Sequence, residues 1–202
     1  MKKIISSGAE AVIYLDGKNV VKKRISKSYR IPELDKKIIR SRTKAERKLI
    51  KKSGEVISSP MPDDETAFDE IVMPFIDGEK LSETLNSYPV EKQKKVLELV
   101  GREVAKLHDA GIVQGDLTTS NMILKDDEVF IIDFGLGSFN AKYEQKGVDV
   151  HLLKQALEAK HFQNFDELFS AFKKGYEKRS KEEAKKVFER LNLIEKRGRY
   201  RH

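Results

Sequence analysis

The chain has 202 residues with a net charge of +7, 39% hydrophobic residues, 36% charged residues and no cysteine. Without cysteine there is neither a disulfide framework nor a thiolate metal site, which fits a reducing cytoplasm. The longest apolar runs, such as residues 129–132, are far shorter than the roughly 20 residues of a membrane span, and the N-terminus has no apolar region of signal-peptide length. Composition therefore predicts a soluble, cytoplasmic protein with no membrane partner.

Short β-favouring runs fill the first quarter of the chain, and three of them read as strands: residues 4–5, 11–15 and 19–24. The tetrapeptide DGKN at 16–19 suits a hairpin turn. Pro32 lies in a basic connection, after which apolar residues in 38–52 recur on one side of a helix. A buried strand then ends at Pro74, and Asp77-Gly78 marks a turn.

The remainder of the chain is mostly helical. Helices are expected over 91–109, over 148–160, after Asn164 and after Ser180. The last two are predicted to begin with capping boxes, in which Asn164 and Ser180 each precede a Glu by three residues. A small hairpin around residues 125–127 separates the first two helices. An apolar stripe typical of a core follows Asn164: Phe165, Leu168, Phe169, Phe172 and Tyr176.

This order of elements predicts an α+β fold in two lobes. We expect a β-rich N-lobe over residues 1–73, a hinge over 74–78, and a reduced helical C-lobe with a basic tail over 79–202.

Several polar residues lie in an order that suits transfer of a nucleotide's terminal phosphoryl group. Such chemistry needs cations for the phosphates, hard oxygen ligands for magnesium and a group that positions the acceptor. Gly8, between the first two strands, would let backbone N–H groups approach phosphates. Lys22, at the end of a strand, would supply a cation, and Glu46 in the following helix would hold it by an ion pair.

The second half of this set lies in the segments GDLTTSN and IDFG. Asp116 would align an acceptor hydroxyl or a water, and Asn121 and Asp133 would ligate magnesium. Turn chemistry alone also explains an Asp or Asn in a loop, so each residue by itself is a weak signal. Their joint order, with strands before helices, is a strong one.

Two assignments stay open at this level. Alternation along NVVKKR does not decide whether Lys22, Lys23 or Arg24 points inward. Glu46 also has possible partners on its own helix in Arg42 and Lys48.

The segments GAEA, VVKKRISKSYRIPELD, RTKAE, GDLTTSNMIL and IDFGLG together resemble the small atypical kinases of the KEOPS (EKC) complex, the PRPK or bud-site-selection kinase family, which are relatives of RIO kinases. The likeness runs from Gly8 to residues 197–199. It implies a minimal two-lobed protein-kinase-like fold, ATP and Mg²⁺ as cofactors, and Ser/Thr phosphorylation or ATP hydrolysis. It also implies a part in forming threonylcarbamoyladenosine (t6A) on tRNA, beside a TsaD-like threonylcarbamoyl transferase and the other KEOPS subunits.

The resemblance selects Lys22 over its neighbours and assigns catalysis to Asp116, Lys22 and Glu46. It implies metal ligation by Asn121 and Asp133. The implied nucleotide-binding residues are Gly8, Ala9, Glu10, Lys22, Met73, Pro74, Ile76, Asn121 and Asp133.

Within this set, Met73 would stand at the back of the adenine pocket. Pro74 would offer its C=O and Ile76 its N–H to the base, and proline suits a position that needs only an acceptor. Asp149 resembles the helical Asp that braces the catalytic-loop backbone.

The chain departs from ordinary kinases both after Asp133 and in the loops that precede it. The last proline is Pro89, so no Ala-Pro-Glu motif follows, and a regular activation segment and peptide-docking helices do not fit. Thr118 replaces a common phosphate-steadying Lys, and Gln114 replaces a usual His. The glycine loop keeps one glycine, Gly8. Ser6 and Ala11 stand at the other two positions where kinases usually have glycine. These departures argue against fast, peptide-directed phosphorylation and leave nucleotide binding intact.

Basic residues cluster in residues 22–44 and in the tail EKRGRYRH at 195–202, where Arg and Tyr can contact RNA. We expect the tail to lie outside the packed core, partly mobile, and to bind tRNA. The alternative function is a tRNA- and protein-binding subunit whose nucleotide site is vestigial or regulatory. An aminoglycoside-type kinase is disfavoured because the C-lobe has no room for its acceptor-binding insertion. The four histidines are expected at the surface.

Overall fold

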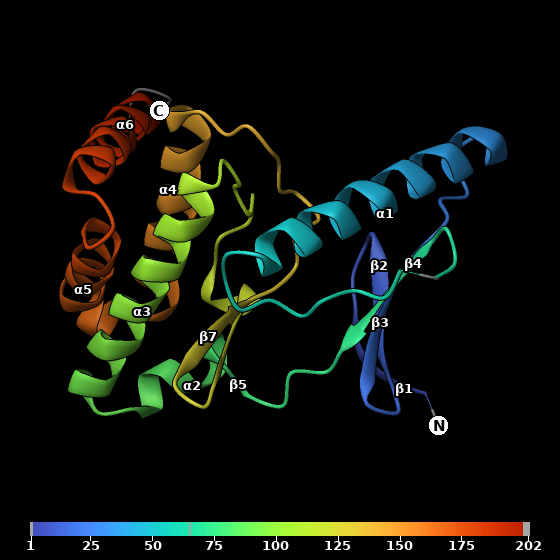
Figure 1. Ribbon diagram of the computed structural model, residues 1–202, viewed down its shortest axis with the longest axis horizontal. Coiled ribbons are helices and arrows are strands. Elements are labelled where there is room, and N and C mark those ends of the chain that lie inside the picture. Colours follow the sequence, from blue (N-terminus) through green and yellow to red (C-terminus); the bar gives the residue numbers. More distant parts are fainter. Residues whose placement is uncertain (1, 65, 200–202) are drawn as a thin grey trace.

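The computed structural model describes residues 2–64 and 66–199, and in it a strand-rich N-terminal part lies beside a helical C-terminal part (Figure 1). The N-terminal part contains an antiparallel sheet in the order β1-β2-β3-β4, made of β1 (Lys3–Ser7), β2 (Ala11–Asp16), β3 (Asn19–Arg24) and β4 (Glu70–Pro74). The predicted turn at 16–19 joins β2 to β3, with Gly17 at a φ of 62° that favours glycine.

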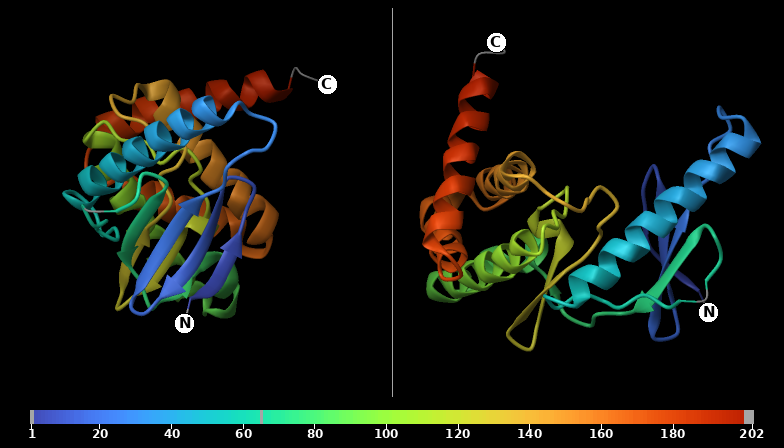
Figure 2. Two further views of the ribbon diagram at one scale, coloured as in Figure 1. Left: turned by 90° about the vertical axis from the view of Figure 1, so that its right-hand side faces the viewer. Right: turned by 45° about the horizontal axis from the view of Figure 1, so that its top comes forward.

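Strand β3 decides which cations enter the interior. Successive residues of a strand face opposite sides of the sheet. Lys22 and Arg24 are each only 8% exposed, whereas Lys23 between them is exposed and pairs with Glu70 at 2.7 Å. The buried face is covered by α1 (Pro32–Gly54), which crosses the sheet in the left view of Figure 2.

Helix α1 is longer than the sequence predicts. We expected a connection at Pro32 and a helix over 38–52, but the helix begins at Pro32. A proline fits the first helical position because its missing N–H has no intrahelical partner there and its fixed φ is already helical. Glu33 and Asp35 in the first turn are favourable to the positive end of the helix dipole.

The C-terminal part holds a second sheet in the order β5-β6-β7, made of β5 (Glu79–Lys80), β6 (Met122–Lys125) and β7 (Glu128–Ile131). Its helical segments are α2 (Leu81–Thr84), η1 (Leu85–Ser87), α3 (Val90–Asp109), η2 (Thr119–Asn121), α4 (Tyr143–Lys160), η3 (Phe162–Asn164), α5 (Phe165–Glu177) and α6 (Lys181–Arg199). The predicted hairpin around 125–127 is present, with Asp126 and Asp127 at positive φ. These elements confirm the α+β class.

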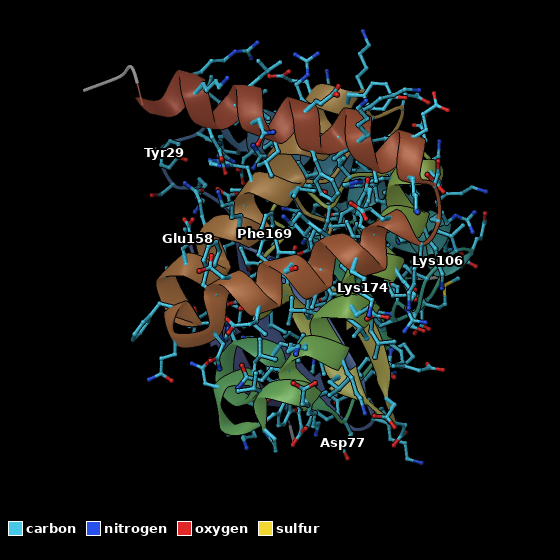
Figure 3. All side chains as sticks on the ribbon, turned by 90° about the vertical axis from the view of Figure 1, so that its left-hand side faces the viewer. Tyr29, Asp77, Lys106, Glu158, Phe169 and Lys174 are labelled. Atoms are coloured by element: carbon cyan, nitrogen blue, oxygen red, sulfur yellow. The ribbon has the colours of Figure 1, made fainter. Side chains whose placement is uncertain are left out.

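Helices α3 and α5 pack side by side, as do α4 and α6 (Figure 1). Gly101 and Gly175 allow the close approach of α3 and α5, because a Cβ at either position would collide with backbone of the other helix. The predicted stripe on α5 is core. In Figure 3 the labelled Phe169 lies between α4 and α5, where Lys154 Nζ of α4 is 5.8 Å from the ring centroid.

One end of α1 is fastened to the C-terminal part. The Ile131 N–H of β7 donates to the Ser58 C=O at 3.2 Å, and the Ser58 hydroxyl donates to the Glu128 carboxylate at 3.2 Å. Ile57 beside them is 6% exposed and belongs to the hydrophobic core. The chain therefore contacts β7 before it returns to β4.

Only one of the two predicted caps forms, and it forms in part. Asn164 precedes α5, but its side chain makes no cap bond and donates to the Gln93 side chain at 3.1 Å. The Ser180 hydroxyl does accept from the Glu183 N–H at 3.3 Å. The Glu183 carboxylate accepts from the Tyr143 hydroxyl and so does not complete the box.

The predicted boundaries also shift around α4 and α6. Helix α4 begins at Tyr143, so only a short connection without helix separates it from Asp133, which agrees with the absence of a regular activation segment. The tail was expected outside the packed core, and Lys196 and Arg197 are indeed exposed, but the tail is not separate from the fold: α6 continues to Arg199, and Glu195 pairs with Lys154 at 2.6 Å. Residues 200–202 lie outside the described residues. Across residues 2–64 and 66–199, no helix combines the length and apolarity that crossing a bilayer requires.

The prediction of surface histidines is wrong for two of them. His108 and His161 are 1% and 2% exposed. His161 Nδ1 lies 2.6 Å from Asn86 Oδ1, an acceptor, so Nδ1 carries the proton, and Nε2 accepts from the Thr119 hydroxyl at 3.1 Å. Burial, reinforced by the charge of Lys160, lowers the pKa of His161 to about 4.

The neutral His161 makes stability fall in acid. Its folded-state pKa lies below its unfolded value, so its contribution is complete above pH 6.5 and is lost as pH falls toward 4. Between pH 7 and pH 5 we expect about 2 kcal/mol of unfolding free energy to be lost through this group. His161→Gln, which keeps a donor and an acceptor but does not titrate, should lack that component in urea unfolding at the two pH values. Parallel losses in both proteins would contradict the assignment.

Candidate functional site

Three charged side chains from three segments meet at the junction of the two parts. Lys22 Nζ of β3 lies 2.7 Å from Glu46 Oε1 of α1 and 2.7 Å from Asp133 Oδ1, which follows β7. The ion pair of Lys22 with Glu46 that we expected is therefore present, and neither Lys48 nor Arg42 competes for Glu46. The register of β3 selects Lys22 over Lys23.

The electrostatics keep Lys22 and Asp133 charged. Burial opposes the charge on Lys22, but Glu46 and Asp133 outweigh it and raise the pKa of the ammonium group. Burial likewise opposes the charge on Asp133, and the Lys22 ammonium outweighs it and lowers the pKa of the carboxyl. At neutral pH the site therefore presents a permanent cation and a permanent carboxylate.

Arg24 is a further site residue that sequence reasoning missed. Its Nη2 lies 2.5 Å from Glu46 Oε2, so Glu46 has one cation on each oxygen. Its Nε is buried and has no hydrogen-bond partner among the described residues. The sequence does indicate that Arg24 lies beside Lys22, because residues two apart in a strand share one face of the sheet.

Asp116 and Asn121 lie together in the loop before β6. Asn121 Nδ2 donates to Asp116 Oδ2 at 3.0 Å and to the Asp116 C=O at 2.9 Å. The Ile132 N–H donates to the Asn121 C=O at 3.0 Å, which brings Asn121 beside the residue that precedes Asp133. The structure thus brings together Lys22 with Asp133, and Asn121 with Asp116, at neighbouring positions.

Asp149 braces this loop as expected. Asp149 lies on α4 and is 1% exposed. Its carboxylate accepts from the Gln114 N–H at 2.7 Å and from the Gly115 N–H at 2.8 Å. Gly115 has a φ of 87°, and a Cβ there would collide with the Leu136 C=O. The loop and the segment after Asp133 therefore touch backbone to backbone.

The loop between β1 and β2 is closed on itself. The Gly8 N–H donates to the Ala11 C=O at 3.0 Å, so this amide is already engaged. The Ala9 C=O accepts from Lys27 Nζ, and the Glu10 carboxylate pairs with Arg42 at 2.8 Å. No hydrogen bond or ion pair among the described residues joins Gly8, Ala9 or Glu10 to Lys22 or Asp133, so their phosphate role stays a prediction.

Strand β4 directs the backbone groups expected to meet adenine. Met73 lies opposite Val20 in the register and shares the face of Lys22. Backbone groups of an antiparallel edge strand point alternately toward and away from the neighbouring strand. The Val72 C=O accepts from Asp63 on the outer side, while the Phe75 N–H donates inward to the Lys18 C=O at 2.9 Å. By this alternation the Pro74 C=O faces outward, whereas Ile76 lies beyond the end of the strand and the direction of its N–H stays a prediction.

The donor set fits magnesium held jointly with a phosphate-bearing ligand. Asn121 and Asp133 offer an amide oxygen and a carboxylate, which are hard ligands. Within residues 2–64 and 66–199, no cluster of three or more His, Cys, Asp or Glu is arranged for a metal. Mg²⁺ commonly takes only one or two protein carboxylates and completes its shell with water and phosphate. A hollow of about 350 Å³ that includes Ile57, Leu99 and Val129 is a separate feature, lined by none of these residues.

Comparison with known proteins identifies the family. Residues 13–146 match the model of the RIO domain. The chain is 44% identical over 212 residues to the KEOPS complex subunit Bud32 of Pyrococcus abyssi, an alignment that covers 98% of this chain and 96% of that protein. The chain is a RIO domain protein of the Bud32 family. The resemblance drawn from its motifs is confirmed.

Other members of the family are longer. The chain is 42% identical to a probable bifunctional tRNA threonylcarbamoyladenosine biosynthesis protein of Methanoculleus marisnigri, over 97% of this chain but 36% of that protein. A protein of the same description from Methanocorpusculum labreanum is 44% identical over 35% of its length. The chain thus spans about a third of these relatives.

A solved structure supports the fold alone. The structure "WaaP in complex with acyl carrier protein" matches with a TM-score of 0.66 at 15% identity, over 99% of this chain and 88% of that one. The neighbour supports a minimal kinase-like fold. The RIO domain places the protein in the class of atypical kinases or ATPases.

Loss of Arg24 should destabilise the protein because Glu46, 2% exposed, would keep only one of its two cations. We expect Arg24→Gln to lower the free energy of unfolding by about 3 kcal/mol, the typical loss when a buried ion pair is broken. Lys23→Gln is the matched control, since its exposed pair with Glu70 should contribute less than about 1 kcal/mol. If urea unfolding shows an equally small loss of unfolding free energy in Arg24→Gln and Lys23→Gln, Arg24 does not stabilise the protein through Glu46.

Proposed function

We propose that the protein is an ATP- and Mg²⁺-dependent atypical serine/threonine kinase or ATPase that serves as the Bud32-type subunit of a KEOPS complex and supports t6A modification of tRNA. The observation that carries the proposal is Lys22 held between Glu46 and Asp133, beside the joined pair Asp116 and Asn121. The names of the relatives, a KEOPS complex subunit and probable tRNA threonylcarbamoyladenosine biosynthesis proteins, support the complex and the pathway.

Each residue has a distinct task in this mechanism. Bound Mg-ATP would supply the transferable phosphoryl group and a divalent charge that neutralises it. Lys22, kept protonated by its carboxylates, holds the phosphates, while Glu46 and Arg24 fix the position of Lys22. Asn121 and Asp133 would hold the metal through their oxygens. Asp116 orients the attacking hydroxyl, or water in the case of hydrolysis, and accepts its proton.

Adenine recognition follows from the outer edge of β4. The outward Pro74 C=O would serve the base as an acceptor and the Ile76 N–H as a donor, and Met73 with Val20 lies on the sheet face that carries Lys22. These positions support residues 74–78 as the hinge between an N-lobe over 1–73 and a C-lobe over 79–202. Gly8, Ala9 and Glu10 would close over the phosphates after the Gly8 amide leaves Ala11.

The lengths of the relatives support a partner. Because the bifunctional relatives are almost three times longer than the part that this chain matches, we propose that a TsaD-like threonylcarbamoyl transferase acts together with this chain in a cytoplasmic complex. The closed contacts of Asp133 with Lys22 and of Gly8 with Ala11 favour one second candidate, a tRNA- and protein-binding subunit with a regulatory nucleotide site.

ATP turnover separates the two candidates. We expect Mg²⁺-dependent release or transfer of the γ-phosphate of radiolabelled ATP, measured with and without transferase and tRNA. Asp133→Ala should lower it at least about a hundredfold because a metal ligand is lost, whereas the fold persists since this side chain is 40% exposed. Asp127→Ala, at an exposed hairpin turn, is the control. Turnover that is unchanged in Asp133→Ala, or absent in the native complex, would favour the regulatory candidate.

The basic tail at residues 195–202 should contribute to tRNA affinity. We expect replacement of Lys196, Arg199 and Arg201 by Gln to weaken tRNA binding and to reduce the slope of log affinity against log salt by about two, because fewer counterions are released. Arg197 is left in place because it pairs with Glu144 at 2.9 Å.

The matched control removes as many charges elsewhere. Lys3, Lys18 and Lys160 are exposed and have no ion pair among the described residues, so their replacement by Gln should change the slope less. Identical slopes for the two triple variants would mean that the tail acts only through net charge.

A further inference from the structure

Gln114 is a fully buried polar residue at the centre of the site, and the mechanism so far gives it no task. It is 0% exposed and lies two residues before Asp116. Ordinary kinases usually have a histidine here. The side chain of Gln114 is an uncharged carboxamide with two N–H donors and one oxygen acceptor.

The carboxamide uses all of these groups on two different segments. Its Oε1 accepts from the Asp116 N–H at 2.7 Å. Its Nε2 donates to the Ile132 C=O at 3.1 Å and to the Asp133 C=O at 2.5 Å. The orientation of the amide is therefore determined by its partners, since a flipped amide would set oxygen against two carbonyls and N–H against N–H.

Asp133 needs such support. Its φ of 58° lies in the left-handed region, which is unfavourable for a residue with a Cβ. A backbone held there must be fixed by its surroundings, and the donor on its C=O comes from Gln114. The direction in which the Asp133 carboxylate leaves the chain therefore depends on Gln114.

Gln114 is itself anchored to the helices. Its own N–H donates to the buried carboxylate of Asp149 on α4 at 2.7 Å. A continuous path of hydrogen bonds thus leads from α4 through Asp149 and Gln114 to both Asp116 and Asp133.

We infer that Gln114 is a positioning residue that couples the acceptor-binding Asp116 to the metal-binding Asp133. One carboxamide sets the separation of the two carboxylate-bearing loops, a task that needs three hydrogen bonds at once. A histidine ring has two nitrogens and so satisfies at most two of these partners. The inference rests on the proposed ATP turnover and adds a residue to it.

Gln114→Met tests this coupling because methionine keeps the length and volume of the side chain but makes none of the three bonds. We expect kcat to fall roughly tenfold to a hundredfold, with a smaller change in KM for ATP, because the reacting groups lose their mutual position. Gln114→His should recover part of the loss. The Asp116 N–H should exchange with solvent at least about tenfold faster in Gln114→Met, since its acceptor is gone.

Gln93→Met is the matched control. Gln93 is also buried, at 3% exposed, and also bonds through both ends of its amide, to Tyr88 and Asn164 in the helical part. It measures the cost of losing a buried, bonded glutamine and should lower thermal stability without lowering kcat more than about twofold.

The outcomes decide between a coupling residue and a buried spacer. If Gln114→Met loses no more kcat than Gln93→Met at equal folded fraction, the inference is wrong. Should the native protein turn over no ATP, the proposed function fails, and exchange of the Asp116 N–H still decides the inference: an unchanged rate overturns it. If Gln114→Met does not fold, Gln114→His carries the same comparison, and a native kcat with native Asp116 exchange would overturn the coupling.

Discussion

The pairing of buried charges at the junction of the two parts constrains most of the structure. Glu46 is 2% exposed and Lys22 is 8% exposed, and an unpaired charge at such depth would be strongly destabilising. Each finds its partner on a different element, so β3, α1 and the segment after β7 can pack in only a few ways. The position of Asp133 therefore follows from the same pairing that fixes Lys22 beside Glu46.

The same constraint explains why the site is polar and yet rigid. Asp149, Gln114 and His161 are buried with their polar atoms bonded to the loop that carries Asp116 and Asn121. In a medium of low dielectric constant such bonds are costly to leave unmade, which gives the loop one preferred conformation. The helices α3 and α5 behind it approach through Gly101 and Gly175, so the base of the loop is itself firmly packed.

Much of this arrangement could be predicted from local pattern. Strand alternation and the DGKN turn place β2 and β3, and helical spacing places the buried face of α3. The same spacing contains His108, four residues after Val104, so its burial was readable and was overlooked. The start of α1 at Pro32 was missed because a proline ends most helices but can also begin one.

Other features depend on contacts that no local pattern encodes. The burial of His161 depends on Asn86 and Thr119, which are distant in sequence, and Asn164 bonds to Gln93 instead of capping its helix. Lys22 and Arg24 share a strand face, but only the position of α1 decides that both reach Glu46. The three hydrogen bonds of the Gln114 side chain likewise depend on the packing of the Asp116 loop against the segment that carries Asp133.

The attachment of the α1–β4 connection to β7, through the Ser58 C=O and the Ile131 N–H, has a mechanical consequence. Because α1 is also bonded to the N-terminal sheet and its loops, through Asp35 and Glu46, helix and sheet would tilt together about this attachment, and displacement grows with distance from it. With a rise of about 1.5 Å per residue, Glu46 lies about 12 Å from the Gly54 end and Pro32 about 33 Å. A tilt that moves the first turn of α1 by about 3 Å thus shifts Glu46 by only about 1 Å. A displacement applied at the far end of α1 would therefore reach the ion pair of Lys22 with Glu46 reduced about threefold, as on the short arm of a lever.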